Sequence, residues 1–275
     1  MSEDLLAMLD DRRAKYASEW TQGNAPHFEA AGDYRWMADF IGGHPYVLDI
    51  GMGDGRAIVE LLRQGHDVIS IDENIACVMI AGDRLKTAGY TAHVIEREIT
   101  RHQFEDGYEV RYADICQARR PPGGEVVLVE GDILTDAGLV DALRTIAPFD
   151  AVSCWMIGTH EAVHDNRLLK NIETNQSSYR RFVHMKVCEV ADSVLRSGGL
   201  LHIVDRGIDS AEQHEDDLRH DYALIASHTL LVLEATHFRR YVESEQGIEM
   251  RVGAGRGQEV ESRSRTLMSV LFRKP

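Results

Sequence analysis

Long apolar runs and paired cysteines are both missing from this sequence of 275 residues. No apolar run reaches the roughly 18 residues that a membrane-spanning helix needs. The four cysteines, at positions 77, 116, 154 and 188, lie far apart and form no CxxC pair, so we expect free thiols in a reducing compartment. The first residues show no basic segment followed by an apolar stretch, so we expect a cytoplasmic protein that binds no membrane.

Positive charge is also scarce. Lys and Arg number 30 against 45 Asp and Glu, which gives a formal net charge of −15 at pH 7. Such a charge repels phosphate backbones, so we expect no nucleic-acid partner, although a local basic face or a basic partner subunit would change this. Hydrophobic residues make up 44% and charged residues 27%, as in ordinary globular proteins. The length fits a single α/β domain over 1–275, with additions.

The most informative segment is 46–56, which reads Tyr-Val-Leu-Asp-Ile-Gly-Met-Gly-Asp-Gly-Arg. A short apolar run stopped by glycines is typical of a buried parallel strand. Glycine at 51, 53 and 55 allows positive φ and lets a ligand lie against bare backbone. The apolar residues of 56–64 then recur at helical spacing. The segment therefore predicts a strand, a glycine loop and a helix, with a nucleotide-type pocket at the strand's carboxyl end.

Two phosphate-binding fingerprints fit this loop poorly. A dinucleotide loop has the pattern GxGxxG, but here the third glycine comes one residue early and Arg56 stands in its place. A Walker loop needs Gly-Lys-Ser/Thr, which is not present. The order of strand, acid, hydrophobe and GxGxG resembles instead the first motif of class I S-adenosylmethionine-dependent methyltransferases. Their cofactor has no phosphate, so no lysine is required.

The resemblance extends over residues 44–205, where further strand ends follow in the family's order. The second expected strand, 67–71, leads to Asp72 and Glu73, and the third, 126–129, leads to Asp132 and Ile133. The fourth is 149–154, and the fifth, 200–204, follows a turn at Gly198 and Gly199. The resemblance implies that Asp72 takes both ribose hydroxyls of the cofactor. It implies further that Asp132 accepts from the adenine amine and that Ile133 covers the ring.

The cofactor implied is S-adenosyl-L-methionine. The residues expected to hold it are Asp49, Gly51, Met52, Gly53, Gly55, Asp72, Glu73, Asp132, Ile133 and Trp155. We expect Asp49 to order the glycine loop and the methionine end through backbone contacts, which is compatible with a buried, hydrogen-bonded acid. Trp155 either walls the cofactor or belongs to the core.

The fold implied is a three-layer α/β/α sandwich. Its seven-stranded, mostly parallel sheet would end in a C-terminal antiparallel hairpin. We expect a helix over 211–235 and strands over 237–242, 248–252 and 266–272, the last two forming the hairpin.

Three additions to the minimal fold are expected. Residues 1–44 predict two helices, joined near Gly23 and Pro26, that form a lid whose aromatic residues either cover the cofactor or pack on the sheet. Residues 91–120 predict a hairpin of 94–99 with 108–113, a solvated flap or alternatively a homodimer contact. Residues 156–181 form a polar insertion expected to contact the substrate.

This insertion contains the literal zinc-protease signature HExxH at 160–164. The extended signature fails, because Arg167 and Lys170 stand where a glycine and a third histidine are needed. We expect instead that His160 or His164 is a general base, with Glu161 or Asp165 orienting it or contacting the substrate. Solvated loop residues are the plain alternative, and a divalent metal held by His160, His164 and Asp165 is another.

The sequence thus predicts a methyltransferase that methylates oxygen or nitrogen of a small polar molecule. Several alternatives stay open: a protein or RNA methyltransferase, an aminopropyltransferase, a non-catalytic subunit and, remotely, a zinc peptidase. Fold alone does not choose among them.

Overall fold

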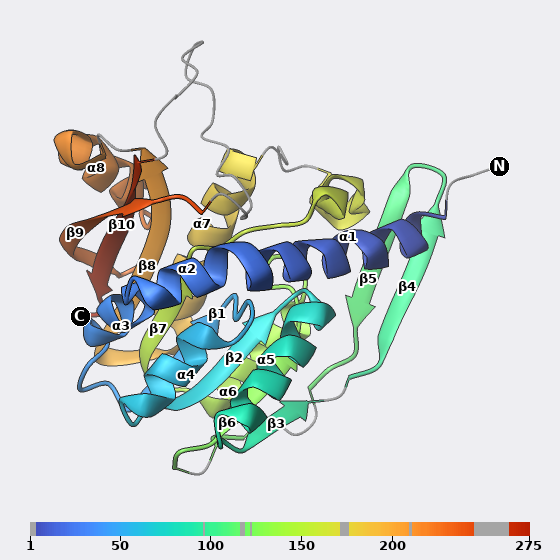
Figure 1. Ribbon diagram of the computed structural model, residues 1–275, viewed down its shortest axis with the longest axis horizontal. Helices are drawn as coiled ribbons and strands as arrows, with labels where there is room; N and C mark the ends of the chain where they lie inside the picture. The colour runs from blue at the N-terminus through green and yellow to red at the C-terminus, as the bar shows by residue number, and fades with distance from the viewer. Residues whose placement is uncertain are drawn as a thin grey trace.

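A computed structural model describes residues 4–95, 97–115, 119–121, 123–170, 176–208, 211–244 and 264–275. It is built on a sheet of eight strands in the order β3-β6-β2-β1-β7-β8-β10-β9 (Figure 1). These strands are β1 (Tyr46–Ile50), β2 (Asp67–Asp72), β3 (Ala92–Ile95), β6 (Val126–Glu130), β7 (Phe149–Trp155), β8 (Leu195–Ile208), β9 (Val232–Val242) and β10 (Ser264–Arg273). In this sheet β10 alone runs in the opposite direction, and it pairs antiparallel with β8 and β9. The predicted α/β class, the mostly parallel sheet and its antiparallel C-terminal pair are confirmed.

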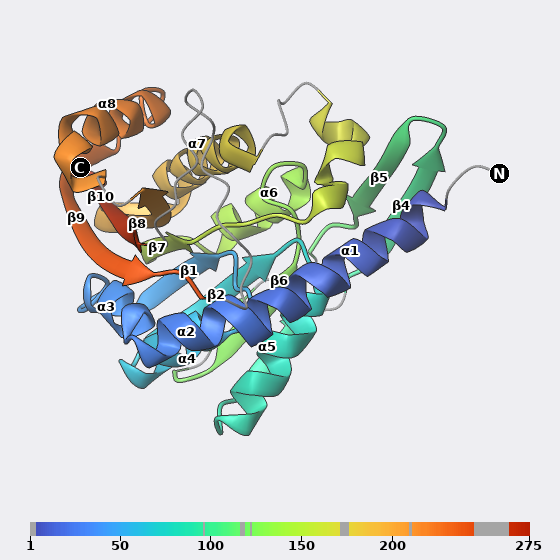
Figure 2. The same ribbon diagram turned by 45° about the horizontal axis from the view of Figure 1, so that its top comes forward.

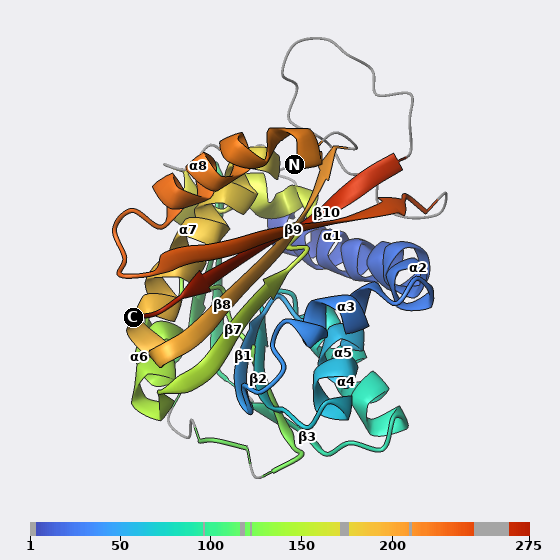
Figure 3. The same ribbon diagram turned by 90° about the vertical axis from the view of Figure 1, so that its left-hand side faces the viewer.

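Helices cover both faces of the sheet (Figure 3). They are α1 (Leu5–Glu19), α2 (Ala25–Ala30), α3 (Asp33–Asp39), α4 (Arg56–Arg63), α5 (Ile75–Thr87), α6 (Ala137–Ile146), α7 (Gln176–Val194) and α8 (Glu215–Ile225). One apolar core joins the sheet to α6, α7 and α8, and a second joins it to α2, α3, α4 and α5. Within the described ranges, every helix is too short or too polar to span a lipid bilayer.

The central strands are buried on both faces because their sequence is mostly apolar, with Asp49 the exception in β1 and Glu130 the exception in β6. All five residues of β1 are buried, as are all five of β6. Strand β1 lies between β2 and β7 and is parallel to both. The carboxyl ends of parallel strands share one edge of a sheet, so the loops that follow β1, β2, β6 and β7 meet there.

The sheet has eight strands, and the prediction of seven is wrong. Residues 92–95, expected partly in the hairpin, pair parallel to β6 as the added edge strand β3. This pairing gives hydrogen-bond partners to an edge of β6 that would otherwise be open. The hairpin consists of β4 (Ile99–Phe104) and β5 (Gly107–Tyr112). Its role as a flap or homodimer contact stays a prediction.

The C-terminal part differs from the expectation in two ways. The helix predicted over 211–235 is shorter than expected. It begins with a short 3-10 turn, η4 (Ala211–His214), continues as α8 and ends at Ile225, and β9 begins at Val232. Residues 232–242 are rich in β-branched and aromatic side chains, which favour a strand. The partner of β10 is therefore β9. The predicted strand 248–252 lies outside the described residues.

The sequence predicted two N-terminal helices joined near Gly23 and Pro26, but the chain stays helical through these residues. A π-helical turn, η1 (Trp20–Asn24), joins α1 to α2, and the Ala25 N–H bonds to the Trp20 carbonyl five residues back. Pro26 lies in the first turn of α2, where a missing N–H leaves no hydrogen bond unmade. The chain turns instead at Gly32, whose φ is +73°. Helix α1 runs from α2 towards the β4–β5 hairpin (Figure 2).

Gly55 provides a test of how the glycine loop is packed. Its φ is +83°, and an added Cβ would lie 2.9 Å from the Ala81 Cα of α5, whereas Gly65, with φ +86°, faces open space. We expect Gly55→Ala to lower the free energy of unfolding by about 2–4 kcal/mol, since strain and overpacking add. Gly65→Ala carries the backbone strain alone, so it should cost about 1–2 kcal/mol. Equal losses in urea denaturation would show that the contact of α4 with α5 does not need glycine.

Candidate functional site

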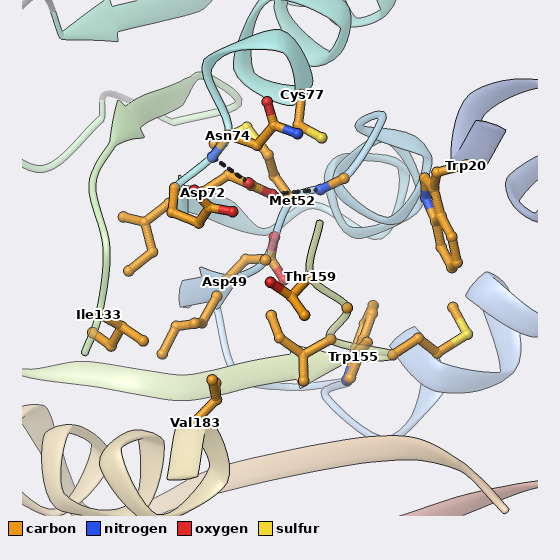
Figure 4. A pocket seen from close by; sticks show the side chains of 18 of the residues that line it. Trp20, Asp49, Met52, Asp72, Asn74, Cys77, Ile133, Trp155, Thr159 and Val183 are labelled. Carbon is orange, nitrogen blue, oxygen red and sulfur yellow. Dashed lines mark hydrogen bonds between the residues drawn. The ribbon is translucent and has the colours of Figure 1, made fainter. Parts of the chain in front are cut away.

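A cleft lies where the loops after β1, β2, β6 and β7 converge. Residues of α1, η1, α3 and α7 complete its walls. Its volume is about 890 Å³ with the solvent at its mouth included. We call it the main pocket, and Figure 4 shows it from close by.

The glycine loop lines the main pocket with backbone. Gly51 and Gly53 have φ values of +90° and +53°. A Cβ added to Gly51 would lie 2.5 Å from the Ile157 side chain, and one on Gly53 would lie 3.0 Å from the Trp20 indole nitrogen. Met52 also lines the pocket and is 2% exposed. Gly51 and Gly53 therefore keep the cleft open, whereas Gly55 serves the packing of α4 on α5.

Asp49 lies at the bottom of the main pocket and ties three strands together. Its carboxylate accepts hydrogen bonds from the Ser70 hydroxyl of β2 at 2.6 Å and the Ser153 hydroxyl of β7 at 2.8 Å. Both serines stand opposite Asp49 in the strand registers. Burial raises the pKa of Asp49, while the two hydroxyls act against that rise. The contacts of Asp49 are thus with neighbouring strands, in place of the loop-backbone contacts that were expected.

Asp72 ends β2 and points into the main pocket (Figure 4). One carboxylate oxygen accepts the Gly53 N–H at 3.0 Å and the other accepts the Asn74 N–H at 2.9 Å. A carboxylate has about four acceptor positions, so each oxygen can still accept a further hydrogen bond. Burial, and secondly the charge of Glu73, raise the pKa of Asp72 to about 7. Asp72 is therefore a preorganised acceptor whose charge changes near neutral pH.

Asp132 and Ile133 follow β6 and also line the main pocket. The Asp132 carboxylate accepts the Leu134 N–H at 2.8 Å and the Thr135 hydroxyl at 2.7 Å. Burial, and secondly Glu73, raise the pKa of Asp132 to about 6. Ile133 is 7% exposed and adds an apolar wall beside this acceptor.

Glu73 lines the main pocket, but its carboxylate binds side chains from other elements. Oε2 lies 2.7 Å from Nη2 of Arg13 on α1, and Oε1 lies 3.2 Å from Nε2 of His160. Burial alone would raise the pKa of Glu73, but His160 and Arg13 together hold it well below its usual range. Glu73 thus links the lid helix to the segment after β7, in addition to the contact with a ligand that was expected.

The three predicted catalytic residues do not meet in the main pocket. His160 is 3% exposed and lines a smaller chamber with Arg13 and Glu73. The Glu161 side chain is 63% exposed and pairs with Arg12 at 2.6 Å, and His164 is exposed. Residues 161–165 form the 3-10 helix η2, whose threefold repeat turns positions four apart away from each other. The described residues contain no cluster of three metal-ligating side chains, so this geometry supports neither proteolysis nor chelation at His160 and His164.

Trp155 forms a fixed wall of the main pocket. Its indole N–H donates to Nδ1 of His202 at 3.1 Å, and Nε2 of His202 lies 2.9 Å from the Ser269 hydroxyl. An indole only donates, so Nδ1 of His202 is an acceptor and its ring is neutral. Burial, and secondly His237, lower the pKa of His202 to about 3, which agrees with a neutral ring.

Part of the pocket lining was not predicted from sequence. Of the lid aromatics, Tyr16, Trp20 and Tyr34 line the pocket, while Phe28 is in the core and Trp36 and Phe40 pack against it. The lining residues that sequence reasoning did not assign to the pocket include Asn74, Cys77 and Val183, whereas Thr159 and Tyr179 lie in the 156–181 insertion expected to contact the substrate. Tyr179 and Val183 lie four apart on α7, a spacing that signals one helix face but not which cavity it faces.

The role of Asp49 can be tested through stability. Asp49→Ala would leave the buried Ser70 and Ser153 hydroxyls without their partner and open a cavity, so we expect the free energy of unfolding to fall by about 3–5 kcal/mol. Ser70→Ala removes one of the two bonds and should cost about 1 kcal/mol. Urea denaturation measures both. A loss for Asp49→Ala no greater than that for Ser70→Ala would contradict the bridging role.

Comparisons with known proteins agree with this architecture. No protein-family model matches the sequence, and no curated protein gives a significant sequence match. The N-methyltransferase NodS from Bradyrhizobium japonicum WM9, in complex with S-adenosyl-L-homocysteine, superposes with a TM-score of 0.50 at 12% identity, over 99% of this chain and 100% of that chain. A putative methyltransferase from Bacillus halodurans gives 0.48 at 15% identity, over 89% and 99%. An O-methyltransferase from Bacillus cereus gives 0.42 at 12%, over 86% and 80%.

Proposed function

The chain has the fold of the methyltransferase NodS, and we propose that it is an S-adenosyl-L-methionine-dependent methyltransferase. The observation that carries this proposal is the juxtaposition of Asp72, Asp132 and the bare backbone of Gly51 and Gly53 in one pocket. These features come from three different strand ends, and they match the sugar, base and amino-acid parts of one sulfonium nucleoside. We expect the protein to be cytoplasmic, since its described cysteines are free and buried.

The residues present fit this cofactor. Asp72 would accept from the two ribose hydroxyls, because two of its acceptor positions remain after its backbone bonds. Asp132 would accept from the exocyclic amine of the base, and Ile133 would pack on the ring. Gly51 and Gly53 would admit the amino-acid part, where any Cβ would meet Ile157 or Trp20.

The chemistry is a displacement at carbon. When bound, the cofactor supplies a methyl group on a positively charged sulfur. The chain's own contribution is to hold the acceptor atom in line with that methyl, an orientation effect that can be worth several kcal/mol. Tyr16 and Trp20 of the lid and Trp155 at the end of β7 line the same pocket and limit the access of water.

We further propose that the acceptor is a small polar molecule methylated on oxygen or nitrogen. The main pocket lies beneath α1, which covers the carboxyl edge of β2 through the contact of Arg13 with Glu73. The net charge of −15 disfavours an extended polyanion. A protein or RNA acceptor would need an open surface beside the pocket.

Asp72 gives the most direct mutational test of the cofactor assignment. We expect Asp72→Ala to weaken S-adenosyl-L-homocysteine binding about 100-fold or more, because two hydrogen bonds to a charged acceptor are lost. Isothermal titration calorimetry at pH 8 measures this. Asp67→Ala is the matched control, since Asp67 begins the same strand at its far end and accepts from Gly124 there. Equal affinities of Asp72→Ala and the wild type would remove the pocket assignment.

The acceptor class can be found by a methyl-transfer screen. Labelled cofactor is incubated with a pool of small metabolites, with total RNA and with denatured protein, and the label is followed by mass spectrometry. We expect label in the small-molecule fraction alone. Label in RNA or protein would reject the small-molecule part of the proposal and leave the cofactor part standing.

A further inference from the structure

Arg13 is a buried cation on the lid helix. It is 4% exposed, it pairs with Glu73 at 2.7 Å, and the Tyr112 hydroxyl is a further hydrogen-bonding neighbour. Glu130 lies farther away, at 3.9 Å from Nη1. Within the described part of the chain, Nε and Nη1 of Arg13 have no hydrogen-bond partner. Its positive charge is therefore only partly neutralised by contacts, and in a buried setting such a charge acts strongly on its neighbours.

The position of Arg13 is fixed by the loop that carries Asp72. The Asn74 side-chain amide donates to the Arg13 carbonyl at 2.9 Å, and Asn74 also caps α5 by accepting from the Ala76 N–H. The Arg13 side chain lines a small chamber that shares Glu73 and Asp132 with the main pocket. The lid thus brings its cation into one chamber with Asp132 and into contact with Glu73, the residue that follows Asp72.

Asp72 is surrounded by opposing charges. The titratable groups that act on it or respond to its charge are Glu73 beside it, Arg13 and Tyr16 of α1, Cys77 of α5 and Tyr179 of α7, with His160 behind Glu73. Glu73 disfavours a charged Asp72, whereas Arg13 favours it. Arg13 acts on Asp132 in the same sense. An ionised carboxylate is the better acceptor for hydroxyl and amine donors.

We propose that Arg13 is a positioning residue whose charge opposes the protonation of Asp72 and Asp132, so that nucleoside binding near neutral pH depends on the docked lid helix. The inference rests on the proposed function, since it concerns the same pocket. Arg13 does not line the main pocket, so it acts through the two carboxylates and not on the ligand itself.

The test compares two variants that break the same ion pair from opposite sides. Affinity for S-adenosyl-L-homocysteine is measured by calorimetry from pH 5.5 to 9.5 in the wild type, Arg13→Gln and Glu73→Gln. Wild-type affinity should decline as pH falls through about 7, by up to tenfold per pH unit, because ligand binding then requires the loss of a proton. Removing the cation should shift this decline to higher pH, and affinity should recover towards the wild-type value by pH 9.5.

Glu73→Gln should shift the decline the other way, to lower pH, because it removes a negative charge from beside Asp72. If the ion pair only holds the lid in place, both variants would instead lose affinity equally at every pH, and that result would overturn the proposal. Thermal unfolding of each variant checks that it is folded. Arg12→Gln is the matched control, since Arg12 neighbours Arg13 but pairs with the exposed Glu161; its profile should equal that of the wild type.

The outcome also separates this inference from the proposed function. No binding to the wild type at any pH would reject the cofactor assignment itself. Binding to the wild type, with both variants shifted in the same direction or with Arg13→Gln unshifted, would reject only the role of Arg13.

Discussion

A carboxylate held by two hydroxyls stands at the centre of the sheet. Asp49 is 1% exposed and accepts from Ser70 and Ser153, which are fully buried on the two neighbouring strands. Because both serines lie opposite Asp49, the bonds fix the register of β2 and β7 against β1. A slip of one residue would turn these side chains to the wrong face. The loops after the three strands, with Gly51, Asp72 and Trp155, keep their relative positions through this contact.

The pocket residues at the strand ends could be predicted because the signals are local. Residues 46–51 show an apolar run, an acid and a glycine within a few positions, and 46–50 form the strand β1. Asp72 and Asp132 each follow such a run and lie in one pocket. No long-range information was needed, because parallel strands bring their carboxyl ends to one edge of the sheet.

The features that sequence reasoning missed depend on contacts between distant segments. The pair of Arg13 with Glu73 joins positions 60 apart, and nothing near Arg13 in the sequence signals it. His160 was expected as a base because it follows the fourth strand at its carboxyl end, but its ring lies in the smaller chamber and binds Glu73. The eighth strand was missed for a similar reason, since β3 depends on an open edge of β6.

The account is tested most directly by a crystal structure of the complex with S-adenosyl-L-homocysteine. It predicts the ribose hydroxyls within hydrogen-bond distance of the Asp72 carboxylate, the base amine at Asp132 and the amino-acid part against Gly51 and Gly53. A ligand seated elsewhere, or a cleft filled by the chain's own side chains, would contradict it.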